Sequence, residues 1–140
     1  MKKYDPCPCG SKLLYHKCCK PIHEGAPPQD ALALMRSRYS AYVLGLCDYI
    51  IETTHPENVV RRTDIDAWKK EINQFCKTTR FVSLDVLEVV DGEDQSVVAF
   101  RANMFYNEKD VSFTERSTFE KLNGRWLYKS GEVEPGHVRP

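Results

Sequence analysis

The sequence lacks a long hydrophobic run and an excess of charge of either sign. Its longest apolar candidate, residues 42–51, is interrupted by Asp48 and falls short of the roughly 18 residues that a membrane span needs. Twenty basic residues balance twenty acidic ones, so no overall positive field favours nucleic acid. The sequence also contains no low-complexity segment and no internal repeat. We therefore predict a globular chain without a membrane span and without a specific nucleic-acid partner.

A secretion signal is not expected either. The chain opens with the basic pair Lys2-Lys3, but Tyr4-Asp5-Pro6 follows where a signal peptide would continue with an apolar stretch. A reducing compartment keeps cysteines as free thiols. We therefore predict a cytoplasmic location.

Cysteine, in contrast, is concentrated near the start of the chain. Four of the six cysteines lie within 13 residues, as the pairs Cys7-Pro8-Cys9 and Cys18-Cys19. A structural Zn²⁺ ion takes four thiolate or imidazole ligands in a tetrahedron, which a pair, a loop and a second pair can supply. Gly10 gives the chain the freedom to turn directly after the first pair. The pattern predicts a closed, non-catalytic zinc site.

Other interpretations of this cluster stay open. A disulfide framework is disfavoured, because adjacent cysteines such as Cys18 and Cys19 bridge poorly and nothing marks the chain as secreted. A redox switch that releases zinc on oxidation is a second alternative, since neighbouring lysines would activate clustered thiolates. His16 or His23 could also replace one cysteine as a ligand.

The stretch CPCGSKLLYHKCC resembles the SEC-C motif, the small zinc-binding module at the end of the SecA translocation ATPase. Lys12-Leu13 stands where many members have a second glycine and a lysine, a departure that affects the loop more than the ligands. By this resemblance one structural zinc ion is bound by Cys7, Cys9, Cys18 and Cys19. Because the module of SecA is a docking surface, the resemblance implies a protein partner, associated with translocation or the ribosome by analogy.

A second resemblance covers nearly the whole chain. Residues 34–42 (LMRSRYSAY) resemble the signature of the YchJ-like, UPF0225-type family, as do Thr54-His55-Pro56 and Glu115-Arg116-Ser117. The family implies a nuclear transport factor 2-like domain, in which a curved antiparallel sheet wraps on helices to form a cone with a pocket. Members often carry a second SEC-C copy at the end, which this sequence does not contain.

The spacing of apolar residues predicts an α+β order by itself. Helical periodicity favours helices at residues 30–45, at 47–53 and from Thr63 onward, the last with a capping box between Thr63 and Asp66. Alternation favours strands at 81–90, 96–106, 111–122 and 125–133, joined by turns such as Asn123-Gly124. Together with the resemblance, this predicts a zinc-binding knuckle at 1–24, a cone-shaped domain at 25–134 with three helices and a curved four-stranded antiparallel sheet, and a tail at 135–140.

The predicted third strand carries two polar residues on an otherwise apolar face, Glu115 and Ser117. A buried carboxylate needs a partner, which Arg36 or Arg38 in the first helix could supply. We favour a structural ion pair over a functional pocket, because structural pairs perturb carboxylates as readily as catalytic sites do. The candidate pocket residues are Arg36, Arg38, Tyr39, Tyr42, His55, Glu115, Ser117 and Trp126.

Two classes of function follow from these features. The first is a non-catalytic interaction protein, in which the knuckle docks a partner and the cone supplies a stable body with a ligand cavity. The second is a small-molecule enzyme whose pocket is lined by Glu115, His55 and Tyr39, with His55 as a general base. No complete acid–base pair at a defined spacing, no Ser-His-Asp pattern and no phosphate loop is evident, so the first class is favoured and no catalytic residue is assigned.

Overall fold

The computed structural model describes residues 4–58, 61 and 63–134, so that the predicted tail at 135–140 lies outside it. The helical elements are a short 3₁₀ turn η1 (Tyr15–Lys17), α1 (Cys19–His23), α2 (Ala31–Leu44), α3 (Cys47–Glu52) and α4 (Ile65–Thr78). The strands are β1 (Thr79–Val90), β2 (Gln95–Tyr106), β3 (Lys109–Asp110), β4 (Phe113–Leu122) and β5 (Arg125–Val133). Within the described ranges no helix is both long enough and apolar enough to cross a membrane.

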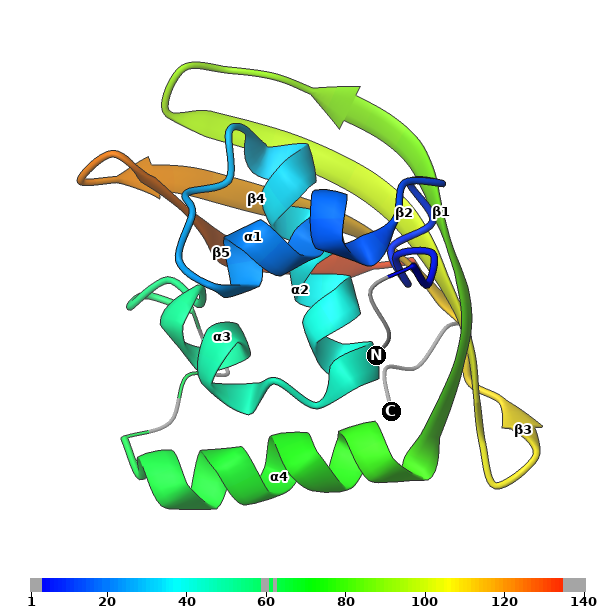
Figure 1. Cartoon of the computed structure of the whole chain (residues 1–140). Coiled ribbons are helices and arrows are strands. Elements are labelled where there is room, and N and C mark those ends of the chain that lie inside the picture. Colours follow the sequence, from blue (N-terminus) through cyan, green and yellow to red (C-terminus); the bar gives the residue numbers. More distant parts are fainter. Residues whose placement is uncertain (1–3, 59–60, 62, 135–140) are drawn as a thin grey trace.

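The strands form one curved antiparallel sheet in the order β1-β2-β4-β5, with β3 paired to β2. Register shifts at Phe81/Ser83 and Val86/Glu88 interrupt the pairing of β1 with β2. Such irregularities bend a strand and increase its twist, and the β1–β2 pair accordingly sweeps around the helices (Figure 1). Helix α2 lies against the concave face and α4 runs across one end, so the predicted cone of helices and antiparallel strands is confirmed.

The three predicted helices of the cone are present as α2, α3 and α4. Helix α2 begins after Asp30, whose Oδ1 accepts a hydrogen bond from Ala33 N at 2.8 Å, and it ends at Gly45 in the left-handed conformation, at φ +74°. The predicted capping box at Thr63 is wrong. Asp64 caps α4 instead, because its Oδ1 accepts from the backbone N–H of Ala67 at 3.1 Å.

The four predicted strands are present, although β4 begins two residues later than expected. The Asn123-Gly124 turn is confirmed as a two-residue hairpin with φ of +52° and +79°. A second tight hairpin, at Asn107-Glu108, was not predicted. Its φ values of +47° and +67° fold β3 back onto β2. Glutamate rarely adopts this conformation, so the sequence indicated only a loop there.

Helix α2 contributes to three apolar clusters at once. Leu34 belongs to the main core between α2 and the sheet, and Ala41 belongs to a second core with α3 and α4. Leu44 packs against the third cluster, which the N-terminal cysteines form with Tyr15. The polar Ser37 and Ser40 of the same helix are fully buried. Ser37 Oγ bonds to the Tyr49 hydroxyl of α3, and Ser40 Oγ contacts the sulfurs of Cys7 and Cys19. Helix α2 is therefore the central element of the molecule.

Replacing Asp30 by alanine should lower the free energy of unfolding by about 1 kcal/mol, because α2 loses its N-cap hydrogen bond. Asp30→Asn is the matched control, since an asparagine oxygen can accept the same bond and should retain most of the stability. Urea unfolding of the three proteins measures the difference. Equal losses in the two variants would contradict a capping role.

Candidate metal centre and internal cavity

The knuckle, defined here as residues 4–24, starts with a small closed loop. Cys7 N donates to Leu13 O and Tyr15 N donates to Asp5 O, each at 2.9 Å. Gly10 sits at the turn with φ +79°, and a Cβ there would come within 3.3 Å of Leu84 O in β1. Only glycine meets both conditions without strain, so this position allows the loop to turn and to lie against the sheet.

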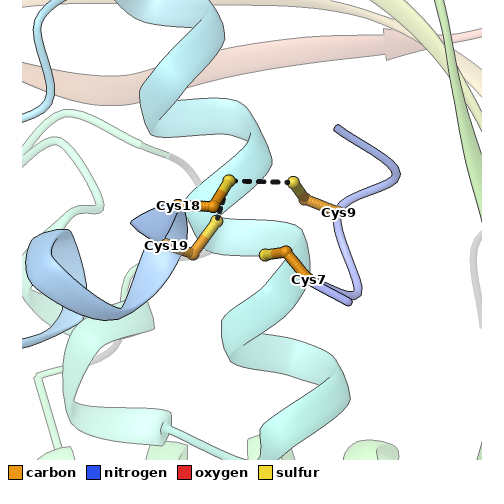
Figure 2. A group of neighbouring side chains, drawn as sticks. All are labelled: Cys7, Cys9, Cys18 and Cys19. Carbon is orange, nitrogen blue, oxygen red and sulfur yellow. Dashed lines mark hydrogen bonds between the residues drawn. The ribbon is translucent and has the colours of Figure 1, made fainter. Parts of the chain in front are cut away.

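The loop brings the first cysteine pair to the start of α1, where the second pair lies (Figure 2). Cys18 Sγ lies 3.6 Å from Cys9 Sγ and 3.9 Å from Cys19 Sγ, and the four sulfurs, with Cys7, all lie within 4.8 Å of one another. Metal–sulfur bonds of about 2.3 Å in a tetrahedron require sulfurs about 3.8 Å apart. The four side chains therefore fit a tetrahedral metal ion.

This candidate centre is closed by protein on all four positions. Cys7, Cys9 and Cys19 are buried, with at most 5% of their surface exposed. A catalytic metal needs a position for water or substrate, whereas four protein ligands are typical of a structural site. The arrangement can hold a metal and stabilise the knuckle, and it leaves no position for a reacting molecule.

The thiols of Cys9, Cys18 and Cys19 differ in pKa, because they differ in burial and in their bonds within the cluster. Hydrogen bonds from Cys19 and Cys7 lower the pKa of the Cys9 thiol far below its usual range. The bonds to Cys7 and Cys9 raise the pKa of Cys19, and burial raises that of Cys18 to about 11. A bound dication would displace the protons of these thiols, because cysteines bind metals as thiolates.

Two serine hydroxyls contact sulfurs of the cluster. Ser11 Oγ lies 3.1 Å from Cys18 Sγ, while Ser40 Oγ donates to Cys19 Sγ at 3.4 Å and lies 3.5 Å from Cys7 Sγ. Hydroxyl donors of this kind orient metal ligands and offset part of the thiolate charge. Since Ser40 belongs to α2, the candidate centre is completed by the body of the protein.

Further hydrogen bonds join the knuckle to α2. Arg36 Nη1 donates to Cys9 O at 2.7 Å. His23 Nε2 lies 2.8 Å from Ser37 O, and a carbonyl can only accept, so Nδ1 of the neutral ring accepts the Tyr15 hydroxyl at 2.7 Å. Burial lowers the pKa of His23 and raises that of Tyr15 to about 12, which agrees with these roles. His23 is thus a link between knuckle and helix and lies outside the ligand cluster.

A cavity of about 280 Å³ lies between α2, α4 and the concave face of the sheet. Its walls are mainly aromatic and aliphatic. Five of the eight candidate pocket residues line it, namely Arg38, Tyr39, Tyr42, Glu115 and Ser117. The remaining lining residues are Met35, Trp68, Glu71, Ile72, Phe75, Phe81, Phe100, Ala102, Met104, Phe113, Phe119 and Tyr128.

The polar end of the cavity is built around Glu115. Its Oε2 accepts hydrogen bonds from Ser117 Oγ and, at 2.8 Å, from the Tyr128 hydroxyl. Burial raises the pKa of Tyr128, so the phenol remains a donor. The guanidinium carbon of Arg38 lies 4.8 Å from the centre of the Tyr128 ring, in a cation–π contact. A Cβ at Gly131 would overlap the Glu115 carboxylate, which explains a glycine within β5.

Arg38 also fixes the C-terminal end of α3. Its Nη1 donates to Ile50 O at 2.9 Å and to Thr53 Oγ1 at 2.7 Å. A cation at the C-terminus of a helix is stabilised by the helix dipole and the unpaired carbonyls there. Arg38 therefore joins α2, α3 and β5. The ion pair between Glu115 and Arg36 or Arg38 stays a prediction.

The structure places three candidate pocket residues outside the cavity lining. Arg36 binds the knuckle, and Trp126 packs in the main core. His55 Nδ1 accepts from Glu57 N at 3.0 Å, so Nε2 is the nitrogen that donates to Glu120 Oε1 at 2.8 Å. Both ring nitrogens of His55 are thus used in hydrogen bonds that hold the loop after α3 in place. The imidazole predicted as a general base does not line the cavity.

Known proteins resemble this chain in sequence and in fold. The family described as "YchJ, middle NTF2-like domain" matches residues 30–131. The chain belongs to this family. A UPF0225 protein of Sodalis glossinidius is 42% identical over 96% of this chain and 88% of its own length. A UPF0225 protein of Streptomyces coelicolor is 38% identical over 91% of this chain and 94% of its own.

Two solved structures extend the likeness of this YchJ-family chain to the knuckle. The solution structure of a SEC-C motif containing protein from Rhodopseudomonas palustris is 34% identical, with a TM-score of 0.77 over 95% of this chain and 98% of that one. A crystal structure of a SEC-C motif containing protein from Psychrobacter arcticus is 27% identical, with a TM-score of 0.75 over 99% and 85% of the two chains.

Several residues of this YchJ-family site were not singled out as site residues from the sequence. Ser40 lies in the LMRSRYSAY segment, but an isolated serine gives no sign that it faces sulfur. Tyr128 gives no local sign of its role, because its hydroxyl bond to Glu115 depends on a residue 13 positions away on a neighbouring strand. Gly131, a glycine inside a strand, is the signal that could have indicated a close approach there.

Replacing Ser40 by alanine should weaken binding of Zn²⁺, used as the probe ion, by about tenfold or more, because the thiolates of Cys7 and Cys19 lose a hydroxyl contact. Competition with a chromophoric chelator measures the affinity. The exposed Ser130 supplies the control, since Ser130→Ala should leave the affinity unchanged. The same affinity in both variants would exclude a supporting role for Ser40.

Proposed function

We propose that this YchJ-family protein is a non-catalytic docking protein whose knuckle is held in shape by one Zn²⁺ ion. The closed set of four thiolates supports this, because soft sulfur ligands in a tetrahedron favour zinc over hard cations such as Mg²⁺ and Ca²⁺. Free thiols of this kind persist in a reducing compartment, so we propose a cytoplasmic location.

The observation that carries the docking proposal is that large apolar side chains of the knuckle are exposed to solvent. Tyr4 is 72% exposed and Leu13 is 54% exposed, although the module is small. Lys12, Lys17 and Lys20 are exposed on the same module. We call these five residues the knuckle surface. Apolar side chains among lysines suit a partner protein that offers an apolar side chain flanked by acidic residues.

Charge favours a protein partner over nucleic acid. Residues 1–24 carry a surplus of three positive charges, and one Zn²⁺ with four thiolates contributes two negative ones, which leaves the module near +1. Nucleic-acid binding depends on neutralising many phosphates, for which this charge is too small. By analogy with the SecA module, we place the partner among proteins of translocation or of the ribosome.

An enzymatic function has weaker support. The carboxylate of Glu115 is engaged by Ser117 and Tyr128, and His55 is engaged by Glu57 and Glu120 on another side of the sheet. The imidazole of His55 thus lies outside the cavity that Glu115 lines. A general base must lie within hydrogen-bond reach of its substrate, which His55 does not from its present position.

A photo-crosslinking amino acid at Leu13, in the full chain inside its native host, tests the docking proposal. We expect a discrete crosslinked protein from this position and none from Leu87, which is 58% exposed on β1 and serves as the control. Changing Lys12, Lys17 and Lys20 to glutamate should abolish the adduct while zinc stays bound. No adduct from Leu13, or the same adducts from Leu13 and Leu87, would contradict the proposal.

A further inference from the structure

One cysteine of the candidate metal centre differs from the other three in its exposure. Cys7, Cys9 and Cys19 are buried, whereas Cys18, directly before α1, is partly exposed. A small oxidant therefore meets Cys18 first. From this asymmetry we propose that Cys18 is a site of oxidative modification, at which hydrogen peroxide joins Cys18 to Cys9 in a disulfide and releases the metal. This modification rests on the proposed zinc centre and is independent of the docking partner.

The surroundings of the Cys18 sulfur are open to a small polar molecule. Ser11 Oγ lies 3.1 Å from this sulfur, and Ser11 is itself partly exposed. Ser40, in contrast, contacts the sulfurs of Cys7 and Cys19 from a fully buried position in α2. Peroxide can thus reach Cys18 past a polar side chain, while the body of the protein covers Cys7 and Cys19.

Metal binding supplies the reactive form of the sulfur. Cysteines bind metals as thiolates, and the thiolate is the form that attacks an oxidant. The other two cysteines lack this activation, because among the described residues no metal-ligand cluster includes Cys47 or Cys76. Burial also raises the pKa of the Cys76 thiol to about 11, which keeps this group protonated at neutral pH.

The oxidation consists of two balanced steps. The Cys18 thiolate attacks one oxygen of hydrogen peroxide, the O–O bond breaks and hydroxide leaves, so that Cys18 becomes a sulfenic acid. The Cys9 thiolate then attacks the Cys18 sulfur, an S–S bond forms and the sulfenic oxygen leaves as a second hydroxide. Together the two sulfurs lose the two electrons that reduce one molecule of peroxide.

Geometry selects Cys9 as the second sulfur. Cys9 Sγ lies 3.6 Å from Cys18 Sγ, and the two residues belong to separate segments of the knuckle (Figure 2). Cys19 Sγ is nearly as close, at 3.9 Å. The Cα atoms of adjacent residues, however, are only about 3.8 Å apart, whereas a disulfide usually joins Cα atoms roughly 4.4–6.8 Å apart. A bond between Cys18 and Cys19 would therefore be strained.

The disulfide removes half of the metal ligands. Four sulfurs within 4.8 Å of one another suit one tetrahedral ion, and each must be a thiolate to hold it. Cys7 and Cys19 alone cannot complete the tetrahedron, so the zinc ion leaves. Reduction of the disulfide by a dithiol returns both thiolates and restores the site.

Treatment of the zinc-loaded full chain with hydrogen peroxide tests the proposal. Mass spectrometry of peptides should find a disulfide between Cys9 and Cys18, and a metallochromic indicator should record zinc release in step with it. A reagent that traps sulfenic acids should label Cys18 first. A different cysteine labelled first, a different disulfide, or zinc that stays bound after the disulfide forms would overturn the proposal. Reduced protein that holds no zinc would instead contradict the proposed zinc centre on which it rests.

A matched pair of variants assigns the reactive sulfur. Imidazole is also a zinc ligand, so Cys18→His and Cys19→His both keep four ligands. Peroxide should release zinc at least about tenfold more slowly from Cys18→His, whereas Cys19→His should keep most of the original rate. Cys47→Ser and Cys76→Ser should leave the rate unchanged. Equal rates in the two histidine variants would refute the role of Cys18. If either histidine variant does not bind zinc, the first residue that the sulfenic acid reagent labels in the unaltered chain decides.

Discussion

The hydrogen bonds between the knuckle and helix α2 hold the two parts of the molecule together. Arg36 reaches the backbone of Cys9, the ring of His23 reaches the carbonyl of Ser37, and Ser40 contacts the thiols of Cys7 and Cys19. Ser37 and Ser40 are fully buried, so their polar groups rely on protein partners instead of water. An intact knuckle is therefore part of the stable structure of α2.

The opposite side of α2 faces the cavity. Arg38 and Tyr39 alternate in sequence with the residues that hold the knuckle, and helical geometry directs them toward the sheet. Helix α2 thus lies between the candidate metal centre and the internal cavity.

Much of this architecture follows from local sequence. The cysteine spacing, the helix at 30–45 and the alternation in β4 each depend on neighbours along the chain, and the structure has the predicted elements. The burial of Ser37 and Ser40 could not be predicted in this way, because apolar periodicity detects only the side of α2 that faces the sheet. The positions of His55 and Tyr128 depend on a contact between the segment after α3 and β5, in which His55 N donates to Tyr128 O. Such long-range pairing leaves no local pattern.

We propose that four thiolates close a structural metal centre against α2. X-ray absorption at the zinc edge, on protein purified without an affinity metal, tests it most directly. We expect one zinc per chain with four sulfur neighbours at about 2.3 Å and no nitrogen or oxygen neighbour. A shell that contains nitrogen or oxygen at about 2.0 Å, or reduced protein that retains no zinc, would contradict it.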